Sequence, residues 1–302
     1  MTDGPTRDMI GYGAHRPEAP WPKGKRIAVN FCINYEEGGE RCTLNGDDGS
    51  EDRISDVVVD RRLGGRDLNI ESSYNFGSRI GYWRLLKAFT DRGLPATINL
   101  VGLAGEQVPD PLAAMIHAGF DIQCHGWRWI DYATLTEAEE RDHISRSVAQ
   151  VVRLTEERPL GYYAGLPSLN TRRLVTEAGF LYDSDAYDDE RPYWSTEFSR
   201  PLLVLPYSLD TNDSRFARGA GYETGEQFFT YIKDSFDVLR AEGGTMLTIG
   251  LHSRLIGRPG RIGALWRILD YISSHEDAWI TRRCDIARAW ISAHPPGTGV
   301  AS

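Results

Sequence analysis

The sequence predicts an α/β protein built on a parallel β-sheet, either open or closed into a barrel. Short runs rich in β-branched and aromatic residues alternate with longer segments whose apolar residues recur every three to four positions, and glycines follow where helices should end. Such strand–helix alternation is typical of parallel sheets. The 302 residues allow two domains, but α/β barrels use as much chain for one core. Because no repeat or shift in composition marks a linker, we expect one domain over residues 1–302.

Six short runs are predicted to form buried strands: residues 26–35, 96–101, 120–124, 202–206, 245–251 and 278–281. Three amphipathic segments are predicted to form helices: residues 81–92, 136–156 and 225–242. Residues 38–78 are polar and rich in Gly, Asp and Arg, and their length predicts an inserted loop with a role in function or assembly. Residues 188–222 look irregular and aromatic-rich, a composition suited to the wall of a pocket.

The composition excludes several classes of partner and location. The formal net charge is −9, and the absence of any basic run argues against binding to nucleic acid or to an anionic membrane surface. The first residues carry no signal-peptide pattern, and no stretch of about 18 uncharged apolar residues follows, so we expect a cytoplasmic protein. The four cysteines are widely spaced, which predicts neither a disulfide framework nor a structural zinc site.

Ionisable side chains directly follow three of the predicted strands. Glu36 and Glu37 follow the first strand, His125 follows the third and His252 follows the strand over residues 245–251. Because barrel active sites are built at the carboxyl ends of strands, these groups are candidates for catalysis. Each also has a structural interpretation: a solvated acidic turn, a buried core histidine, and a helix start ahead of Pro259. Their recurrence at three strand ends favours a site.

These motifs, in this order, resemble the polysaccharide deacetylases of the NodB-homology group, a family of amide and ester hydrolases with a distorted (β/α) barrel. Within that family the chain is similar to the metal-independent bacterial allantoinase branch. The shared motifs lie between about residues 11 and 290 and include NYEEGGE (34–40), ESSYNFGSR (71–79), CHGWRW (124–129) and GLHSRLIGRPGR (250–261). The resemblance implies a distorted barrel that hydrolyses a cyclic amide, with allantoin, opened to allantoate, as the first candidate.

Two departures from the deacetylase pattern concern the metal. Deacetylases carry paired aspartates where this chain has Glu36 and Glu37, the first acting as base and the second as metal ligand. They also use two histidines in H-x-x-x-H spacing, and here the position four residues after His125 is Trp129. An indole offers no lone pair to a metal. One histidine and one carboxylate are too few for a tight catalytic zinc site, so we expect neither a metal nor another cofactor.

The resemblance also implies roles for the catalytic candidates. Glu36 corresponds to the base that activates water, and His252 is the candidate acid for the leaving nitrogen. His125, with its tautomer held by Glu37, is expected to polarise the carbonyl or to orient the water. Asp183 is a candidate partner of His252, although a role in a turn is equally consistent.

Glu37 and four further residues are predicted to bind the substrate. Arg254 and Arg258 are candidates to stabilise the oxyanion, although both could equally pair with the acidic residues 188–190. Trp129 and Trp194 are candidates to stack on a ring, and Trp129 is favoured because it replaces a metal ligand.

The substrate and the assembly complete these expectations. Leu166 stands where allantoinases tend to carry a polar or basic residue, which leaves a cyclic imide or hydantoin open as the substrate. A metal-dependent carbohydrate N-deacetylase and a catalytically inactive binding barrel are two competing hypotheses. The long insertion and the missing second histidine oppose the deacetylase. The resemblance implies a homo-oligomer, a tetramer, with a small cyclic amide as its other partner.

Overall fold

The computed structural model describes residues 7–297, and one β-sheet runs through them. Its strands are β1 (Ile27–Tyr35), β2 (Thr97–Leu100), β3 (Asp121–Cys124), β4 (Gly161–Tyr162), β5 (Tyr182–Asp183), β6 (Tyr193–Ser195), β7 (Leu202–Val204), β8 (Thr245–His252) and β9 (Ala278–Ile280). All six predicted strands are present. The sequence pattern missed β4 and β5 because each has only two residues, too few to show a period, and it missed β6 because Tyr193–Ser195 has no β-branched residue.

Helices connect the strands and cover the outside of the sheet. They are α1 (Leu68–Phe76), α2 (Tyr82–Thr90), α3 (Gly102–Gln107), α4 (Pro109–His117), α5 (Glu137–Thr155), α6 (Thr171–Glu177), α7 (Gly225–Glu242), α8 (Ser253–Ile256), α9 (Pro259–Ser273) and α10 (Arg283–Ala293). Capping boxes begin the two longest, with Thr136 and Glu139 at α5 and Thr224 and Gln227 at α7. The three predicted helices are therefore confirmed within a few residues.

The strand order is β6-β7-β5-β4-β3-β2-β1-β8, with β9 pairing alongside the first part of β1. All pairs are parallel except β6 with β7. Every residue of β1 is buried, as expected for a parallel strand covered on both faces. In register, Asn34 of β1 lies beside Asn99 of β2 and His252 of β8, which aligns the carboxyl ends of the three strands.

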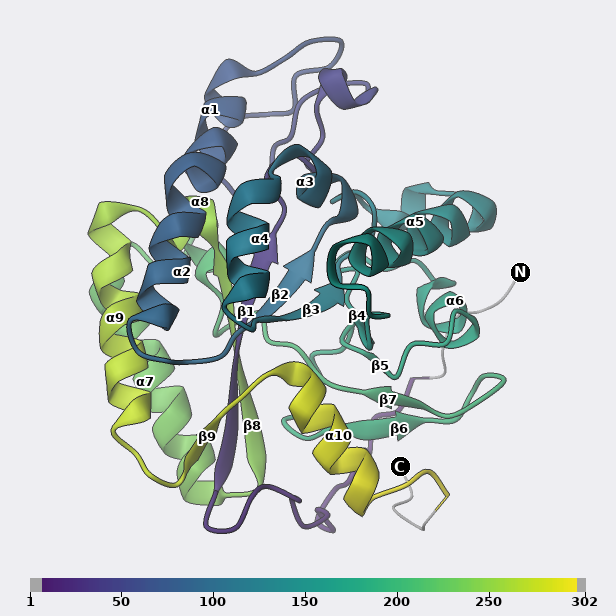
Figure 1. The fold of residues 1–302 in the computed structure, drawn as a ribbon, viewed down its shortest axis with the longest axis vertical. Helices are drawn as coiled ribbons and strands as arrows, with labels where there is room; N and C mark the ends of the chain where they lie inside the picture. Colours follow the sequence, from purple (N-terminus) through teal and green to yellow (C-terminus); the bar gives the residue numbers. More distant parts are fainter. Residues whose placement is uncertain (1–6, 298–302) are drawn as a thin grey trace.

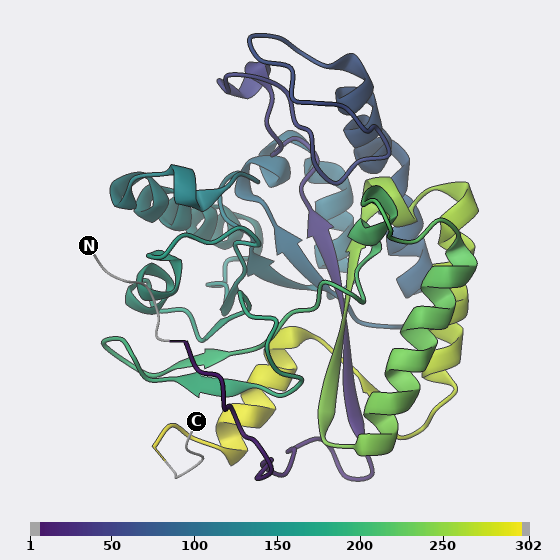
Figure 2. The ribbon, with the colours of Figure 1, turned by 180° about the vertical axis from the view of Figure 1, so that it is seen from behind.

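The sheet curls into part of a barrel, as Figures 1 and 2 show from opposite sides. A regular barrel would have further strands beside β8. Here the irregular chain around β6 and β7 is hydrogen-bonded to β8 instead. The Gly250 N–H donates to Thr211 O at 3.1 Å, and the Met246 N–H donates to Glu190 O at 2.9 Å. The predicted α/β fold with a distorted barrel is confirmed in this form.

The predicted inserted loop is shorter than expected. Residues 38–67, which we call the insertion loop, hold only one short 3-10 turn at Thr43–Asn45, whereas residues 68–78 are helical. A π-helical turn at Gly77–Gly81 joins α1 to α2, so that one helical rod runs from Leu68 to Thr90. The sequence pattern missed α1 because its buried face mixes Ile70 and Tyr74 with Ser73 and so lacks a clear apolar stripe.

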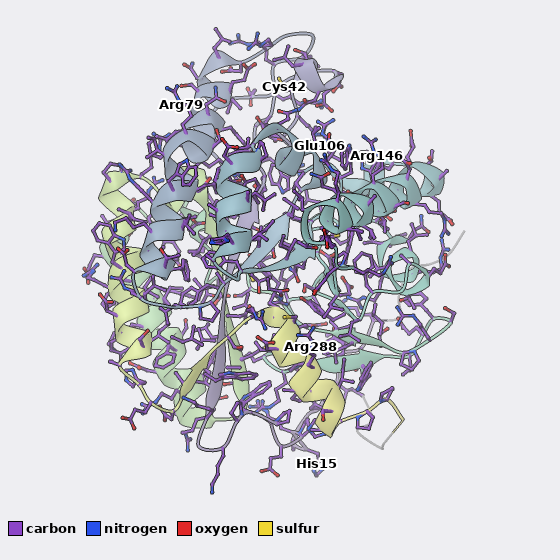
Figure 3. All side chains as sticks on the ribbon, in the orientation of Figure 1. His15, Cys42, Arg79, Glu106, Arg146 and Arg288 are labelled. Carbon is purple, nitrogen blue, oxygen red and sulfur yellow. The ribbon has the colours of Figure 1, made fainter. Side chains whose placement is uncertain are left out.

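The insertion loop lies beyond the carboxyl end of β1, at the top of Figure 1. Figure 3 places Cys42 and Arg79 at this end of the molecule and His15 and Arg288 at the opposite end. Among residues 7–297, no helix has both the length and the apolar character needed to cross a bilayer.

Candidate active site

A cavity of about 420 Å³ lies at the carboxyl ends of β1, β3 and β8. Its lining includes Asn34, Glu36, His125, Trp129, Ser214 and His252. The structure therefore brings the three predicted catalytic residues, Glu36, His125 and His252, to one place. It does so because each follows a strand of the same parallel sheet, in the arrangement typical of barrel enzymes.

The carboxylate of Glu36 is the centre of this arrangement. Its Oε1 lies 3.2 Å from His125 Nε2 and 3.5 Å from His252 Nε2, and its Oε2 accepts a 2.6 Å hydrogen bond from Arg254 Nη2. Burial by itself raises the pKa of a carboxyl, but the charges of Arg254 and His252 and the hydrogen bonds from both imidazoles hold the pKa of Glu36 well below its usual 4.5. Glu36 is therefore an ionised carboxylate at neutral pH.

His252 is held by a carboxylate that sequence reasoning missed. Asp213 Oδ1 lies 2.6 Å from His252 Nδ1, and Asp213 Oδ2 accepts from the His252 backbone N–H at 2.7 Å. Burial by itself lowers the pKa of an imidazole, but the carboxylates of Glu36 and Asp213 outweigh it and raise the pKa of His252 to about 9. At neutral pH His252 is therefore an imidazolium. Its Nε2 hydrogen is available to Glu36 Oε1, and both residues line the cavity.

His125 is oriented by a backbone carbonyl. Its Nδ1 lies 2.7 Å from Tyr163 O and its Nε2 lies 3.2 Å from Glu36 Oε1. Since the Tyr163 carbonyl only accepts, Nδ1 is the donor in that contact. The imidazole also stacks on the Tyr163 ring, with centroids 4.9 Å apart. The expectation that Glu37 holds the His125 tautomer is therefore wrong.

The glycine after His125 is required by packing. Gly126 has φ +73°, and a Cβ there would lie 2.0 Å from Tyr132 Oη. Any other residue would be strained in its backbone and would also collide with the tyrosine hydroxyl. This constraint explains the His-Gly pair at the end of β3.

Glu37 belongs instead to a buried layer beneath the cavity. Its Oε1 accepts from Ser253 Oγ at 2.6 Å and from Arg254 Nη1 at 3.1 Å, and its Oε2 accepts from the Tyr82 hydroxyl. Neither Glu37 nor Arg254 lines the cavity, and Arg254 is completely buried. These two residues, predicted to bind substrate, therefore support Glu36 from behind rather than touch a ligand.

Two glycines let the helical rod approach this layer. A Cβ at Gly77 would lie 2.4 Å from Glu37 Oε1, and a Cβ at Gly81 would lie 2.2 Å from Ser253 O. Both glycines belong to the π-helical turn, a local distortion that is frequent at functional sites. Gly77 belongs to the motif ESSYNFGSR (71–79), and this motif therefore packs closely against Glu37 of the acidic pair.

Of the two tryptophans predicted to bind a ring, only Trp129 lines the cavity. Trp194 donates from Nε1 to His294 O at 2.7 Å and packs in a separate apolar cluster with Trp21 and Trp290. Arg258 lies 3.5 Å from Asp56 Oδ2 and stacks over the Phe76 ring, outside the cavity. We therefore correct the prediction that Trp194 and Arg258 form part of this site.

Asp183 is not the partner of His252. Its Oδ2 accepts from Arg172 Nε at 2.9 Å. Asp185 accepts from the backbone N–H groups of Ala164 and Gly165 at 2.7 and 2.8 Å, so it shapes the wall that includes Gly165 and Leu166. The partner of His252, Asp213, lies in the PYSLDTND stretch (206–213), but sequence spacing alone does not separate it from other nearby acids.

Comparison with known proteins places this geometry in a family. The polysaccharide deacetylase model matches residues 69–181. A Schizosaccharomyces pombe protein named "Putative polysaccharide deacetylase" is 38% identical over 96% of this chain and 98% of its own length. The chain belongs to the polysaccharide deacetylase family.

Solved structures of this family reproduce the whole fold. The crystal structure of PuuE allantoinase is 51% identical and superposes with a TM-score of 0.94, covering 96% of this chain and 98% of that one. A "probable Polysaccharide deacetylase" from Pseudomonas aeruginosa PAO1 is 50% identical, with a TM-score of 0.93 over 96% and 99% of the two chains. Among the sequence relatives, a peptidoglycan deacetylase of Helicobacter pylori is 26% identical over 73% of this chain and 72% of its own length.

The residues of this chain do not fit the metal site that the deacetylase pattern implies. Glu37, at the position of the metal-binding carboxylate, has both oxygens engaged by Ser253, Arg254 and Tyr82. Trp129 occupies the position of the second histidine. Among residues 7–297, no three His, Cys, Asp or Glu side chains gather in a metal-binding group. The charge that a metal would supply next to the acidic pair is provided by the guanidinium of Arg254.

Proposed function

We propose that this protein hydrolyses a ring amide bond without a metal, with allantoin as the first candidate substrate. The observation that carries the proposal is the contact of Glu36 Oε1 with two imidazoles while Arg254 binds Oε2. This arrangement sets an ionised carboxylate beside a protonated histidine in a small cavity. The fold and high identity shared with PuuE allantoinase support the same reaction class.

The reaction needs a base for water, a donor for the oxyanion and an acid for the leaving nitrogen. Glu36 Oε1 takes a proton from the water whose oxygen attacks the ring carbonyl carbon. In this step His125 is doubly protonated: Tyr163 O holds its Nδ1 hydrogen, and its Nε2–H is presented to the carbonyl oxygen as negative charge develops there. A tetrahedral intermediate with the water oxygen bonded to the carbonyl carbon is the result.

Collapse of this intermediate breaks the ring C–N bond. His252 donates its Nε2 proton to the leaving nitrogen, and Asp213 stabilises the imidazolium before the transfer. The proton held by Glu36 then has a short path back to His252, whose Nε2 lies 3.5 Å from Oε1. The product is an open chain with a new carboxyl group, and both residues regain their starting protonation states.

The cations around Glu36 also have a cost for catalysis. They favour its ionised form, but a carboxylate with a lowered pKa is a weak base. The return transfer to His252 removes the proton from Glu36 after each turnover, and the attack on the carbonyl is assisted by the two imidazoles. The proposal therefore assigns more of the rate acceleration to charge stabilisation than to the basicity of Glu36.

The cavity also bears on the choice of ring. Trp129 and Tyr163 supply aromatic faces, and Leu166, Leu209 and Ile54 supply apolar surface. This lining suits one small flat ring more than an extended sugar chain. Because Leu166 cannot hydrogen-bond the ureido arm of allantoin, a plainer hydantoin or cyclic imide is the second candidate.

Turnover by chelator-treated protein tests the proposal. We expect hydrolysis of at least one of allantoin, hydantoin, dihydrouracil and succinimide, followed as ring-opened product by chromatography, and none by the Glu36→Gln variant. The polysaccharide deacetylase name of the S. pombe relative makes an acetylated chitooligosaccharide the necessary comparison. A higher kcat/KM on that oligosaccharide than on every cyclic amide would overturn the proposal.

A further inference from the structure

The chain segment after β7 places in the cavity wall a serine whose buried hydroxyl the mechanism does not use. Ser214 lines the cavity and is 2% exposed. Within residues 7–297 its Oγ has no hydrogen-bond partner. A buried hydroxyl without a partner is unfavourable, and in a native structure it calls for a physical explanation.

Ser214 is held in place by contacts on both sides of the segment. Asn212, also in the cavity wall, accepts the Ser214 backbone N–H at its Oδ1, 2.8 Å away. Thr211 Oγ1 donates to Thr248 O at 2.6 Å, and Thr211 O accepts from the Gly250 N–H at 3.1 Å. The segment is therefore fastened to β8, the strand that ends at His252, and the backbone of Ser214 is fixed in the cavity wall.

The packing at Gly250 shows how closely this wall is fitted. A Cβ at Gly250 would lie 2.3 Å from Asn212 Nδ2 and 2.6 Å from Tyr207 Oη. Only glycine at this point of β8 leaves room for the Asn212 carboxamide. The carboxamide thus occupies space that a side chain on β8 would otherwise fill.

The same segment also carries the partner of His252. Asp213 bonds to the His252 ring and backbone, while its two neighbours, Asn212 and Ser214, line the cavity. One short 3-10 helix (Asp213–Ala217) therefore fixes the position of the proposed acid and of two polar wall groups relative to each other. A ligand bound to this wall would be held at a fixed distance and orientation relative to His252.

We propose that Ser214, with Asn212 beside it, is a recognition subsite for the polar edge of the substrate ring. This inference rests on the proposed function and deepens it. Rotation about χ1 turns the Ser214 hydroxyl into the cavity, where it can donate to a ring carbonyl or accept from a ring N–H. The remaining wall is partly apolar, and its further polar side chains are Asn34, Asp52, Arg53 and Arg218. Among the lining residues, Ser214 is the one whose buried hydroxyl has no partner. The ligand class is a small cyclic ureide or imide with adjacent C=O and N–H groups.

The proposal separates stability from affinity in a single variant. Ser214→Ala removes a hydroxyl that has no partner in the free protein, so the melting temperature should stay the same or rise. The same change should raise KM for the ring substrate roughly three- to tenfold, with kcat little changed, because one hydrogen bond to bound substrate is lost. A merely structural role for Ser214 would not give this combination.

Ser195 provides a matched control. Its hydroxyl is likewise buried and without a partner in the described part of the chain, but it lies on β6 and does not line the cavity. Ser195→Ala should therefore leave KM unchanged. Equal KM values for the wild type and Ser214→Ala, or equal increases in both variants, would overturn the subsite.

A binding measurement keeps this test separate from the proposed function. Hydantoin is titrated calorimetrically into Glu36→Gln protein with and without Ser214→Ala. A three- to tenfold weaker Kd in the double variant supports the subsite even when turnover of every ring fails, in which case the proposed function alone is overturned. An equal Kd, or no binding to the Glu36→Gln protein, overturns the subsite.

Discussion

Arg254 Nη2 lies 2.6 Å from Glu36 Oε2, and Nη1 of the same guanidinium lies 3.1 Å from Glu37 Oε1. One buried cation thus compensates two adjacent buried carboxylates. Its Nε donates to Ile54 O at 2.7 Å, and its guanidinium packs over the Tyr74 ring. Ile54 has φ +46°, an unfavourable value for a β-branched residue, and it belongs to the insertion loop. Arg254 therefore links the insertion loop to the acidic pair.

Removing this cation should disable Glu36. Arg254→Met leaves two buried carboxylates without their cation, so the pKa of Glu36 should rise and part of it should be protonated at neutral pH. We expect kcat to fall about 100-fold or more, with an acid limb of the pH profile that moves to higher pH.

Arg258→Met is the matched control, because Arg258 lies four residues further along and outside the cavity. It should retain near-normal kcat. Steady-state kinetics of both variants, with melting temperatures to monitor folding, check this expectation. Equal losses in the two variants would contradict the role assigned to Arg254.

Replacing Glu36 by Gln should remove turnover while retaining ligand binding. The amide keeps the shape of the side chain but cannot take a proton from water, and loss of a general base costs on the order of 10² to 10⁴ in rate. Calorimetry with a ring ligand and single-turnover kinetics separate the two effects. Near-normal turnover would transfer the base to His125, whose Nε2 lies 3.2 Å away.

His252 should set the alkaline limit of activity. Its acid form is needed to protonate the leaving nitrogen, so kcat/KM should fall as pH rises through about 9. The acid limb should lie below pH 4.5, because the pKa of Glu36 is lowered. Asp213→Asn removes one of the two carboxylates that raise the pKa of His252, and the alkaline limb should move to lower pH. An unmoved limb in that variant would assign the titration to another group.

The sequence predicted the site better where residues directly follow a predicted strand than where they follow irregular chain. β1 and β8 each form runs of eight or more buried residues, so Glu36 and His252 could be placed at their ends from the pattern. Asp213 and Ser214 follow irregular chain beyond β7, a three-residue strand, and their positions depend on contacts with β8. Such contacts join residues almost 40 positions apart and leave no periodic signal in the sequence.

The misplaced residues have a similar explanation. Arg254 and Arg258 are one helical turn apart in sequence, but α8 ends at Ile256 and Pro259 begins α9, so the two guanidinium groups diverge. Trp194 lies in a segment that was predicted to be irregular but forms β6, and its indole packs away from the cavity. Composition singled out the segment of Trp194, residues 188–222, but composition does not determine the direction of a side chain.

The homo-oligomer expected from the resemblance to the allantoinase branch remains a prediction. Large apolar side chains are exposed on the insertion loop and α1, where Val58, Leu63 and Leu68 are 90%, 71% and 66% exposed. Exposed apolar surface of this kind often marks an interface. We expect light scattering to give a multiple of the 33.9 kDa chain, near four, and Leu63→Glu with Leu68→Glu to reduce it. Leu169→Glu, similarly exposed elsewhere, is the control. A monomeric wild type would contradict the prediction.

Activity should survive complete chelation. The carboxylate at the metal-ligand position, Glu37, is already bound by Arg254, Ser253 and Tyr82, so a cation would have to displace Arg254 and leave its charge buried without a partner. Restoring the missing imidazole by Trp129→His should therefore not create a zinc site while Arg254 remains. We expect equal kcat/KM before and after chelation, and no bound zinc by elemental analysis in either the wild type or Trp129→His. An inert chelated sample that regains activity with one equivalent of zinc would overturn the assignment of Arg254 as the cation of this site and the metal-free mechanism with it.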